Sequence, residues 1–278
     1  MIKPKKRSWE RLVVDEFQIT SIHSLNQIDT EKKEDIYRRL IPTELFARFE
    51  IDRQTFLNEQ GEHVVNFISP KQAGFAIIEL RLHPEDKDCI FFLEIADTSF
   101  SQVEITFLIM NDPYAERFNT DIDEVGRRTK FGTARRNLTE EVKAMEAGLA
   151  PGQVRKGLGQ MTGFIELARS FFKEMRHDMI VAEPLAYHNA IAFEHYGFNY
   201  MRGKKKMEEI NRGFRPGGEL FKLLDGSTPF KHKGMESTVR GRSWAIHDGI
   251  LGEPWRGVEM YLNLDKPADI NTFPDAIF

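Results

Sequence analysis

The sequence is poor in cysteine and has no long apolar run, and these absences exclude several classes of protein. Cys89 is the only cysteine of the 278 residues, so an intramolecular disulfide and a multi-cysteine metal site are excluded. The sequence contains no run of about 18 apolar residues, so it predicts no membrane-spanning helix. The basic start is followed by Ser8 and Trp9 instead of the apolar core of a secretory signal. We therefore expect a protein of the reducing cytoplasm.

Neither sign of charge dominates, because the formal net charge is only −4. This balance argues against a protein whose main task is to coat nucleic acid. Two short basic runs, the N-terminal tail with Lys3, Lys5, Lys6 and Arg7 and the lysines at 204–206, are usually solvated surface, although they leave a nucleic-acid or partner-binding module as an open alternative. The eight histidines show no metal-ligand spacing, so we expect no metal.

Short apolar segments rich in Phe, Ile and Val follow one another in the first half of the chain. They cover residues 63–68, 75–82, 90–96 and 103–110. Strands linked this closely must run antiparallel, because a parallel crossover needs about a dozen residues. Before them, the helical spacing of apolar residues over 29–52 predicts a helix that Pro42 breaks in two.

Helical and strand patterns alternate in the second half. The expected helices cover residues 139–147, 158–172 and 189–196, and the expected strands cover 179–182, 198–201 and 258–264. Residues 203–254 contain many Gly and Pro, and we expect only patchy order there. The sequence therefore predicts a mixed α+β fold, with a mostly antiparallel sheet flanked by helices, N-terminal helices and a long C-terminal extension.

One glycine-rich stretch opens the helix expected over 158–172. It reads Gln153-Val154-Arg155-Lys156-Gly157-Leu158-Gly159-Gln160. Glycines let the backbone approach a ligand closely, and the first amides of a helix have no partner within the helix. Together with the helix dipole they favour an anion such as a phosphate or pyrophosphate.

The residues around this stretch distinguish it from two familiar nucleotide-binding loops. A dinucleotide-binding fingerprint should directly follow a buried strand, whereas charged residues precede these glycines. A P-loop is excluded, because no Gly-Lys-Ser/Thr is present. A purely structural role, in which the glycines only shape a loop before a core helix, stays open for the stretch taken alone.

Residues 153–198 together resemble the GNAT superfamily of N-acetyltransferases. In that superfamily a loop of the form Q/R-x-x-G-x-G/A opens a helix, and here Gly157 and Gly159 match its glycines. The Gln/Arg position falls on Val154, so that match fails. Further on, residues 189–198 (NAIAFEHYGF) are similar to the family's helix with an aromatic-Gly-Phe corner. Residues 103–108 resemble its fourth strand.

The resemblance implies that acetyl-CoA is the cosubstrate and that three segments bind it. The implied cofactor-binding residues are Leu108, Ile109 and Met110, the stretch from Gln153 to Gln160, and Asn189, Phe193 and Tyr196. In the family, backbone amides of the loop hold the coenzyme A pyrophosphate. The splayed fourth strand offers further backbone amides, here those of residues 108–110.

Acetyl transfer to an amine needs a base for the ammonium proton, donors for the developing oxyanion and an acid for the thiolate. Glu104 is the first candidate base, because it interrupts an apolar strand, and Glu94 is a weaker one. The alternation of Glu104 and Thr106 with apolar residues equally fits a half-exposed strand. Many family members place a Tyr four residues before the corner glycine, where this chain has Phe193. Tyr196 is the remaining candidate acid.

The predicted organisation is a single acyl-CoA-binding domain over residues 1–278. Its core covers about 60–202 with the late strand near 258–264, and it carries an insertion at 111–152 and an extension at 203–278. These extra segments are candidates for a substrate pocket or for surface decoration. In the insertion, Arg127, Arg128, Lys130, Arg135 and Arg136 could bind an anionic substrate. In the extension, Trp244, Trp255 and Phe230 are expected to pack the segment onto the body.

The predicted function is transfer of an acetyl group from acetyl-CoA to a primary amine by direct attack. The acceptor stays open between a small amine, an aminosugar, a peptide terminus and a lysine side chain. A non-catalytic CoA-binding or interaction protein of similar fold is the alternative, supported by Val154 and Phe193. We expect no membrane partner and no nucleic acid, and a homodimer stays open.

Overall fold

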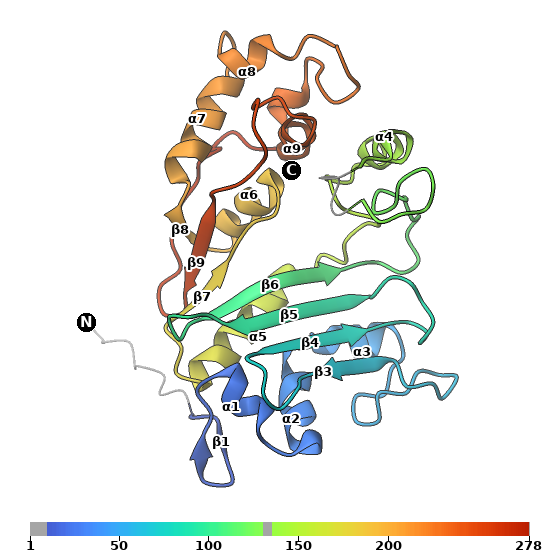
Figure 1. The fold of residues 1–278 in the computed structure, drawn as a ribbon, viewed down its shortest axis with the longest axis vertical. Coiled ribbons are helices and arrows are strands. Elements are labelled where there is room, and N and C mark those ends of the chain that lie inside the picture. Colours follow the sequence, from blue (N-terminus) through green and yellow to red (C-terminus); the bar gives the residue numbers. More distant parts are fainter. Residues whose placement is uncertain (1–9, 130–134, 278) are drawn as a thin grey trace, which may run out of the picture. The chain divides into compact units, whose positions relative to one another are not determined.

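A computed structural model of the chain describes residues 10–129 and 135–277 and divides into two compact units (Figure 1). The first unit comprises Met1–Pro113, Gly157–Ala182 and Asn263–Lys266, and the second comprises Tyr114–Lys156, Glu183–Leu262 and Pro267–Phe278. The first two unit boundaries fall close to the ends of the predicted insertion, whereas the second unit resumes at Glu183, before the start of the predicted extension. The single domain over 1–278 stays a prediction.

The first unit contains the predicted antiparallel meander. Its strands are β3 (Val65–Ile68), β4 (Phe75–Leu80), β5 (Phe91–Asp97), β6 (Val103–Met110) and β7 (Met179–Ala182), hydrogen-bonded in this order. The pairings from β3 to β6 are antiparallel, as the short connections require, and β7 joins β6 in parallel. A two-stranded hairpin of β1 (Val13–Val14) and β2 (Phe17–Gln18) precedes them, and no sequence pattern predicts it.

Helices cover one face of this sheet. The helices of the first unit are α1 (Ile22–Asn26), α2 (Thr30–Tyr37), the 3-10 turn η1 (Arg38–Leu40), α3 (Thr43–Arg48) and α5 (Met161–Glu174). The predicted break at Pro42 is confirmed, since Pro42 precedes the first residue of α3. Alternate residues of the strands, such as Ile78 and Leu93, are fully buried, and the Phe91 ring lies 5.9 Å from that of Phe164 in α5. The face away from the helices is only partly buried.

The second unit is mainly helical. It contains α4 (Leu138–Glu146), α6 (Tyr187–His195), β8 (Asn199–Arg202), α7 (Lys204–Phe214), α8 (Glu219–Lys222), the 3-10 turn η2 (Met235–Ser237), α9 (Val239–His247) and β9 (Glu259–Asn263), whose last residue belongs to the first unit. Strands β8 and β9 pair antiparallel. These elements match the predicted helices at 139–147 and 189–196 and the predicted strands at 198–201 and 258–264.

The expectation of patchy order over 203–254 is wrong, because α7, α8 and α9 lie there. Two of the glycines in this segment stand at helix starts and do not interrupt a helix. Gly203 precedes α7 with a φ of 91°, a conformation that favours glycine, and Gly218 precedes α8. Helix α9 starts after Thr238, whose hydroxyl accepts a bond from the Gly241 amide at 2.9 Å.

An aromatic core joins the insertion to the extension inside the second unit. Trp244 of α9 is 1% exposed and stacks on Phe230 with ring centroids 5.1 Å apart. Its indole N–H donates to the Leu149 carbonyl at 2.8 Å, and Phe118 and Ala144 complete the cluster. The predicted packing of the extension onto the body is confirmed for Trp255, whose indole N–H donates to the Pro184 carbonyl at 2.8 Å and whose ring lies 6.1 Å from that of Tyr187, whereas Trp244 and Phe230 pack on the insertion.

No helix in residues 10–129 and 135–277 is both long and apolar enough to cross a membrane.

We predict that Trp244→Ala lowers the free energy of unfolding by about 3–5 kcal/mol, because it opens a cavity and leaves the Leu149 carbonyl without its hydrogen-bond donor. Trp244→Phe keeps most of the ring volume and should lose less. Denaturant unfolding of both variants measures the difference. Equal stability of Trp244→Ala and the wild type would contradict this account of the core.

Candidate functional site

The glycine loop is fastened to the end of β6 in the first unit. The Leu158 amide donates to the Met110 carbonyl at 3.1 Å, and Asn111 and Gly157 form an antiparallel bridge. A Cβ atom at Gly157 would lie 3.4 Å from the Met110 carbonyl oxygen, so the two backbones are in close contact. The structure thus brings two of the three predicted cofactor-binding segments together.

Beyond this contact, the loop opens into free space. Gly159 has a φ of 72°, and a Cβ atom there would meet no other atom within 4 Å. Helix α5 begins two residues later, and Gln160 at its N-cap makes no side-chain capping bond within the described residues. Such a start presents backbone N–H groups and the positive end of the helix dipole. An anion can approach here without a steric barrier from Gly159.

Strand β7, the parallel neighbour of β6, pairs with only the first part of β6. In the described residues, β7 pairs with β6 only at Val103 and Glu104, although β6 runs on to Met110. A bulge at Thr106 shifts the register between Glu94 and Ile95 of the other neighbour, β5. Bulges of this kind redirect strand residues and are frequent next to active sites.

The ladder with β5 fixes where the amides of β6 point. The Asn111 amide donates to Ile90 on the β5 side, and the direction alternates along an antiparallel ladder. The amides of Leu108 and Met110 therefore point away from β5, whereas that of Ile109 points toward it. Of the three predicted oxyanion donors, the geometry favours Leu108 and Met110.

Glu104 lies on the sheet face away from the helices. It stands opposite Ala96 of β5 and Val181 of β7, and its neighbour Ile105 points into the helix-covered core. The side chain is half-buried, and Glu94 lies on the same face. The alternation in the sequence is therefore real, and it places Glu104 on an accessible face beside the bulge.

The residues before the glycines belong to the second unit and hold their own loop together. Gln153 accepts a bond from the Ala150 amide through Oε1 at 2.7 Å. The Val154 carbonyl accepts from the Phe118 amide at 2.8 Å, and the Arg155 guanidinium donates to the Ala115 carbonyl. Lys156 is exposed. The bonds of Val154 and Arg155 could not be predicted, because their partners lie far away in the sequence.

Helix α6 of the second unit carries the third predicted segment. Phe193 stacks on Phe198 with ring centroids 4.8 Å apart, so it fills the aromatic corner. Tyr196 follows the last residue of α6, and its ring lies 5.4 Å from that of His195. The Asn189 side-chain nitrogen lies 3.2 Å from His188 Nε2.

The predicted arginine cluster of the insertion is engaged by carboxylates of its own unit. Arg127 and Arg135 both pair with Asp123, at 3.2 and 3.3 Å. Lys130 lies outside the described residues. These pairs leave little reason to assign anion binding to the two arginines.

Arg136 is part of a buried network. It bonds Glu141 through Nε at 2.8 Å and also pairs with Asp248. Burial opposes ionisation of Glu141, but bonds from His247 and Arg136 outweigh it and hold the pKa of this carboxyl below its ordinary value. Because loss of Arg136 would leave two buried carboxylates without their partner, this guanidinium is not available to a ligand.

The sequence pattern gives no sign of one half-buried histidine of α6. The His188 Nδ1 atom lies 2.9 Å from the Ser243 hydroxyl of α9. Burial lowers the pKa of His188 to about 4, and the positive charges of Arg240 and His247 act in the same direction. No spacing marks this residue, because Ser243 is distant in the sequence.

Comparisons of the chain with family models, curated proteins and solved structures found no match. Among residues 10–129 and 135–277, no group of three or more His, Cys, Asp and Glu side chains could hold a metal ion.

We predict that acidification from pH 7 to 5 destabilises the protein partly through His188. The unfolded chain takes up a proton near the ordinary pKa of 6.5, whereas the folded chain resists protonation down to about 4. The free energy of unfolding therefore falls as the pH falls through this window, by about 2 kcal/mol at pH 5. Urea unfolding of His188→Gln at both pH values should show a smaller loss than the wild type.

His23→Gln is the matched control, because His23 is exposed. An identical pH dependence in His188→Gln and the wild type would refute the assignment.

Proposed function

We propose that the protein is an N-acyltransferase of the GNAT type, which transfers an acetyl group from acetyl-CoA to a primary amine. The observation that carries the proposal is the attachment of the glycine loop to the end of β6 through Leu158 and Met110. This attachment combines the open backbone at Gly159 with a strand that β7, within the described residues, pairs only at Val103 and Glu104. The sequence resemblance supports the same activity.

The glycine loop and α5 fit the diphosphate of coenzyme A. Amides at a helix start bind phosphate oxygens, and the open space beside Gly159 admits them. The acyl group would then follow the exposed edge of β6, as a strand does when it extends a sheet. Amides of Leu108 and Met110, directed to that edge, are suited to bind the thioester oxygen.

The proposed reaction needs a base for the amine and hydrogen-bond donors for the thioester oxygen. The amine, once deprotonated, attacks the thioester carbon, and β6 amides stabilise the negative charge that develops on its oxygen. Glu104 accepts the amine proton in this proposal. The carbon–sulfur bond breaks, the nitrogen loses its second proton to form the amide, and the thiolate takes up a proton through water. No covalent enzyme intermediate is required.

A protein that binds coenzyme A without transfer is the second candidate. The observation in its favour is Phe193, whose ring packs against Phe198 where many family members have a Tyr. A phenyl ring cannot donate a proton. Binding of acetyl-CoA with no thiol release on any amine would select this candidate.

We predict that Gly159→Glu abolishes acetyl-CoA binding, because the substitution puts bulk and negative charge at the loop. Calorimetric titration measures it. Gly226→Glu is the control, since Gly226 also has a positive φ, 81°, and open space around its Cβ position, but lies outside the loop. It should bind like the wild type. A wild type that binds no acetyl-CoA at millimolar concentration would refute the proposed function.

We predict that Glu104→Gln lowers the turnover of a responsive amine about 10²-fold or more, because the base is lost, while the Kd for acetyl-CoA stays unchanged. The loss should diminish at high pH, where the free amine needs no base. Glu94→Gln tests the other carboxylate of the same face. Loss of activity in Glu94→Gln alone would assign the base to Glu94 and contradict the prediction.

A further inference from the structure

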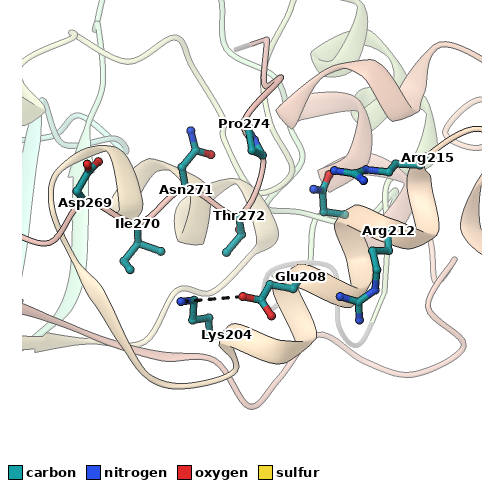
Figure 2. A pocket seen from close by; sticks show the side chains of 10 residues that line it. Lys204, Glu208, Arg212, Arg215, Asp269, Ile270, Asn271, Thr272 and Pro274 are labelled. Carbon is teal, nitrogen blue, oxygen red and sulfur yellow. Dashed lines mark ion pairs between the residues drawn. The ribbon is translucent and has the colours of Figure 1, made fainter.

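The second unit contains a groove that the proposed acyl transfer does not use. One wall is helix α7, and the other is the extended segment 269–274 near the C-terminus (Figure 2). The groove has a volume of about 510 Å³. This is the size of many small-molecule sites.

Two buried polar side chains line the groove, and groups behind them fix their orientation. Asn211 is 9% exposed, and its Oδ1 accepts a bond from the Arg242 guanidinium at 2.8 Å. A guanidinium can only donate, so the oxygen of this amide faces Arg242 and its NH₂ group is left for the groove. Thr272, 6% exposed, is held by two bonds to the Glu194 carboxylate, at 2.9 and 2.6 Å.

The orienting arginine is itself rigid. Arg242 is 4% exposed, donates to the Glu236 carbonyl at 2.7 Å and lies 3.4 Å from the centroid of the Phe273 ring. The donor that Asn211 presents is therefore preorganised, which reduces the entropic cost of binding.

Positive side chains with weak partners line the groove. Arg212 reaches Glu209 only at 3.9 Å, and Lys204 reaches Glu208 only at 4.0 Å. Exposed pairs of this length contribute little. Arg215 is exposed and forms no ion pair within the described part of the chain. A ligand can thus engage these cations without breaking strong contacts.

The charges are separated along the groove. Figure 2 shows Arg212 and Arg215 at one end and Asp269 at the other, with the side chains of Ile270 and Pro274 and the Lys204–Glu208 pair between these ends. Burial lowers the pKa of Arg242, and the positive charge of Arg215 contributes to the shift, so cations converge at the arginine end. The arrangement suits a molecule with an anionic end, an apolar middle and a cationic end.

We propose that this groove binds a small zwitterionic molecule with a phosphate or carboxylate at one end and an ammonium group at the other. Arg212, Arg215 and the Asn211 amide hold the anion, because guanidinium groups bind such oxygens in a bidentate manner. Asp269 pairs with the ammonium group. Ile270 and Pro274 contact the alkyl chain between them.

Titration of the full chain with two probes tests the proposal. 6-Aminohexanoate carries a carboxylate, and 6-aminohexyl phosphate carries a phosphate. The stronger of the two probes identifies the anionic group. Hexanoate lacks the ammonium group and should bind about tenfold more weakly than 6-aminohexanoate.

Single substitutions locate the site. Arg215→Ala should weaken the better probe about tenfold, and Asp269→Asn should remove the preference for 6-aminohexanoate over hexanoate. Arg240→Ala is the matched control, because Arg240 is an exposed arginine of the same unit outside the groove. Its binding should equal that of the wild type.

Two results would overturn the proposal. The first is a wild type that binds neither probe at millimolar concentration, and the second is an equal loss in Arg240→Ala and Arg215→Ala. Gly159→Glu should keep probe binding, so failure of the acyl-CoA site and failure of the groove are distinguishable.

Discussion

The backbone contact between Met110 and Leu158 is the constraint on which the rest of the first unit depends. The chain leaves the unit after Pro113 and re-enters it at Gly157, so the intervening excursion has to be closed before α5 can reach the sheet. Closing a flexible loop of this length costs entropy. Inside the second unit, the Phe118 amide bonds the Val154 carbonyl and ties the two ends of the excursion together. The bond between Leu158 and Met110 holds the chain ends in the first unit, and the bond between Phe118 and Val154 holds them in the second. With the chain held in this way, α5 can bury Phe164 against Phe91.

The same contact explains why β6 can have an open edge without harm. An unpaired strand edge is a template for aggregation, and proteins shorten, cover or bend such edges. Here, β7 ends one residue after its last pairing with β6, the bulge at Thr106 distorts the strand, and the Met110 carbonyl is occupied by Leu158. What remains is a short run of backbone amides.

Patterns that depend on near neighbours are predictable from the sequence, and patterns that depend on distant partners are not. The alternation in residues 75–110 predicts the meander because each strand pairs with the next. The helices of 203–254 escape prediction because glycine normally interrupts a helix, whereas Gly203 stands at a helix start. Within the candidate site, Gly157 makes the predicted close backbone approach and Gly159 has open space around its Cβ position, but Val154 and Arg155 bond to Phe118 and Ala115. No local spacing reveals such partners.

Buried polar groups decide which atoms the second unit presents to a ligand. An apolar residue in place of Arg242 could fill the same volume, and a buried charge is rarely retained for stability alone. Only a donor at that position, however, turns the oxygen of Asn211 inward and its NH₂ group outward. The Glu194 carboxylate accepts hydrogen bonds from the amide and the hydroxyl of Thr272, so this side chain presents only oxygen lone pairs to the groove. Two charges that do not line the groove therefore fix the donor at Asn211 and the acceptor at Thr272, and this dependence argues that the groove surface is specified rather than incidental.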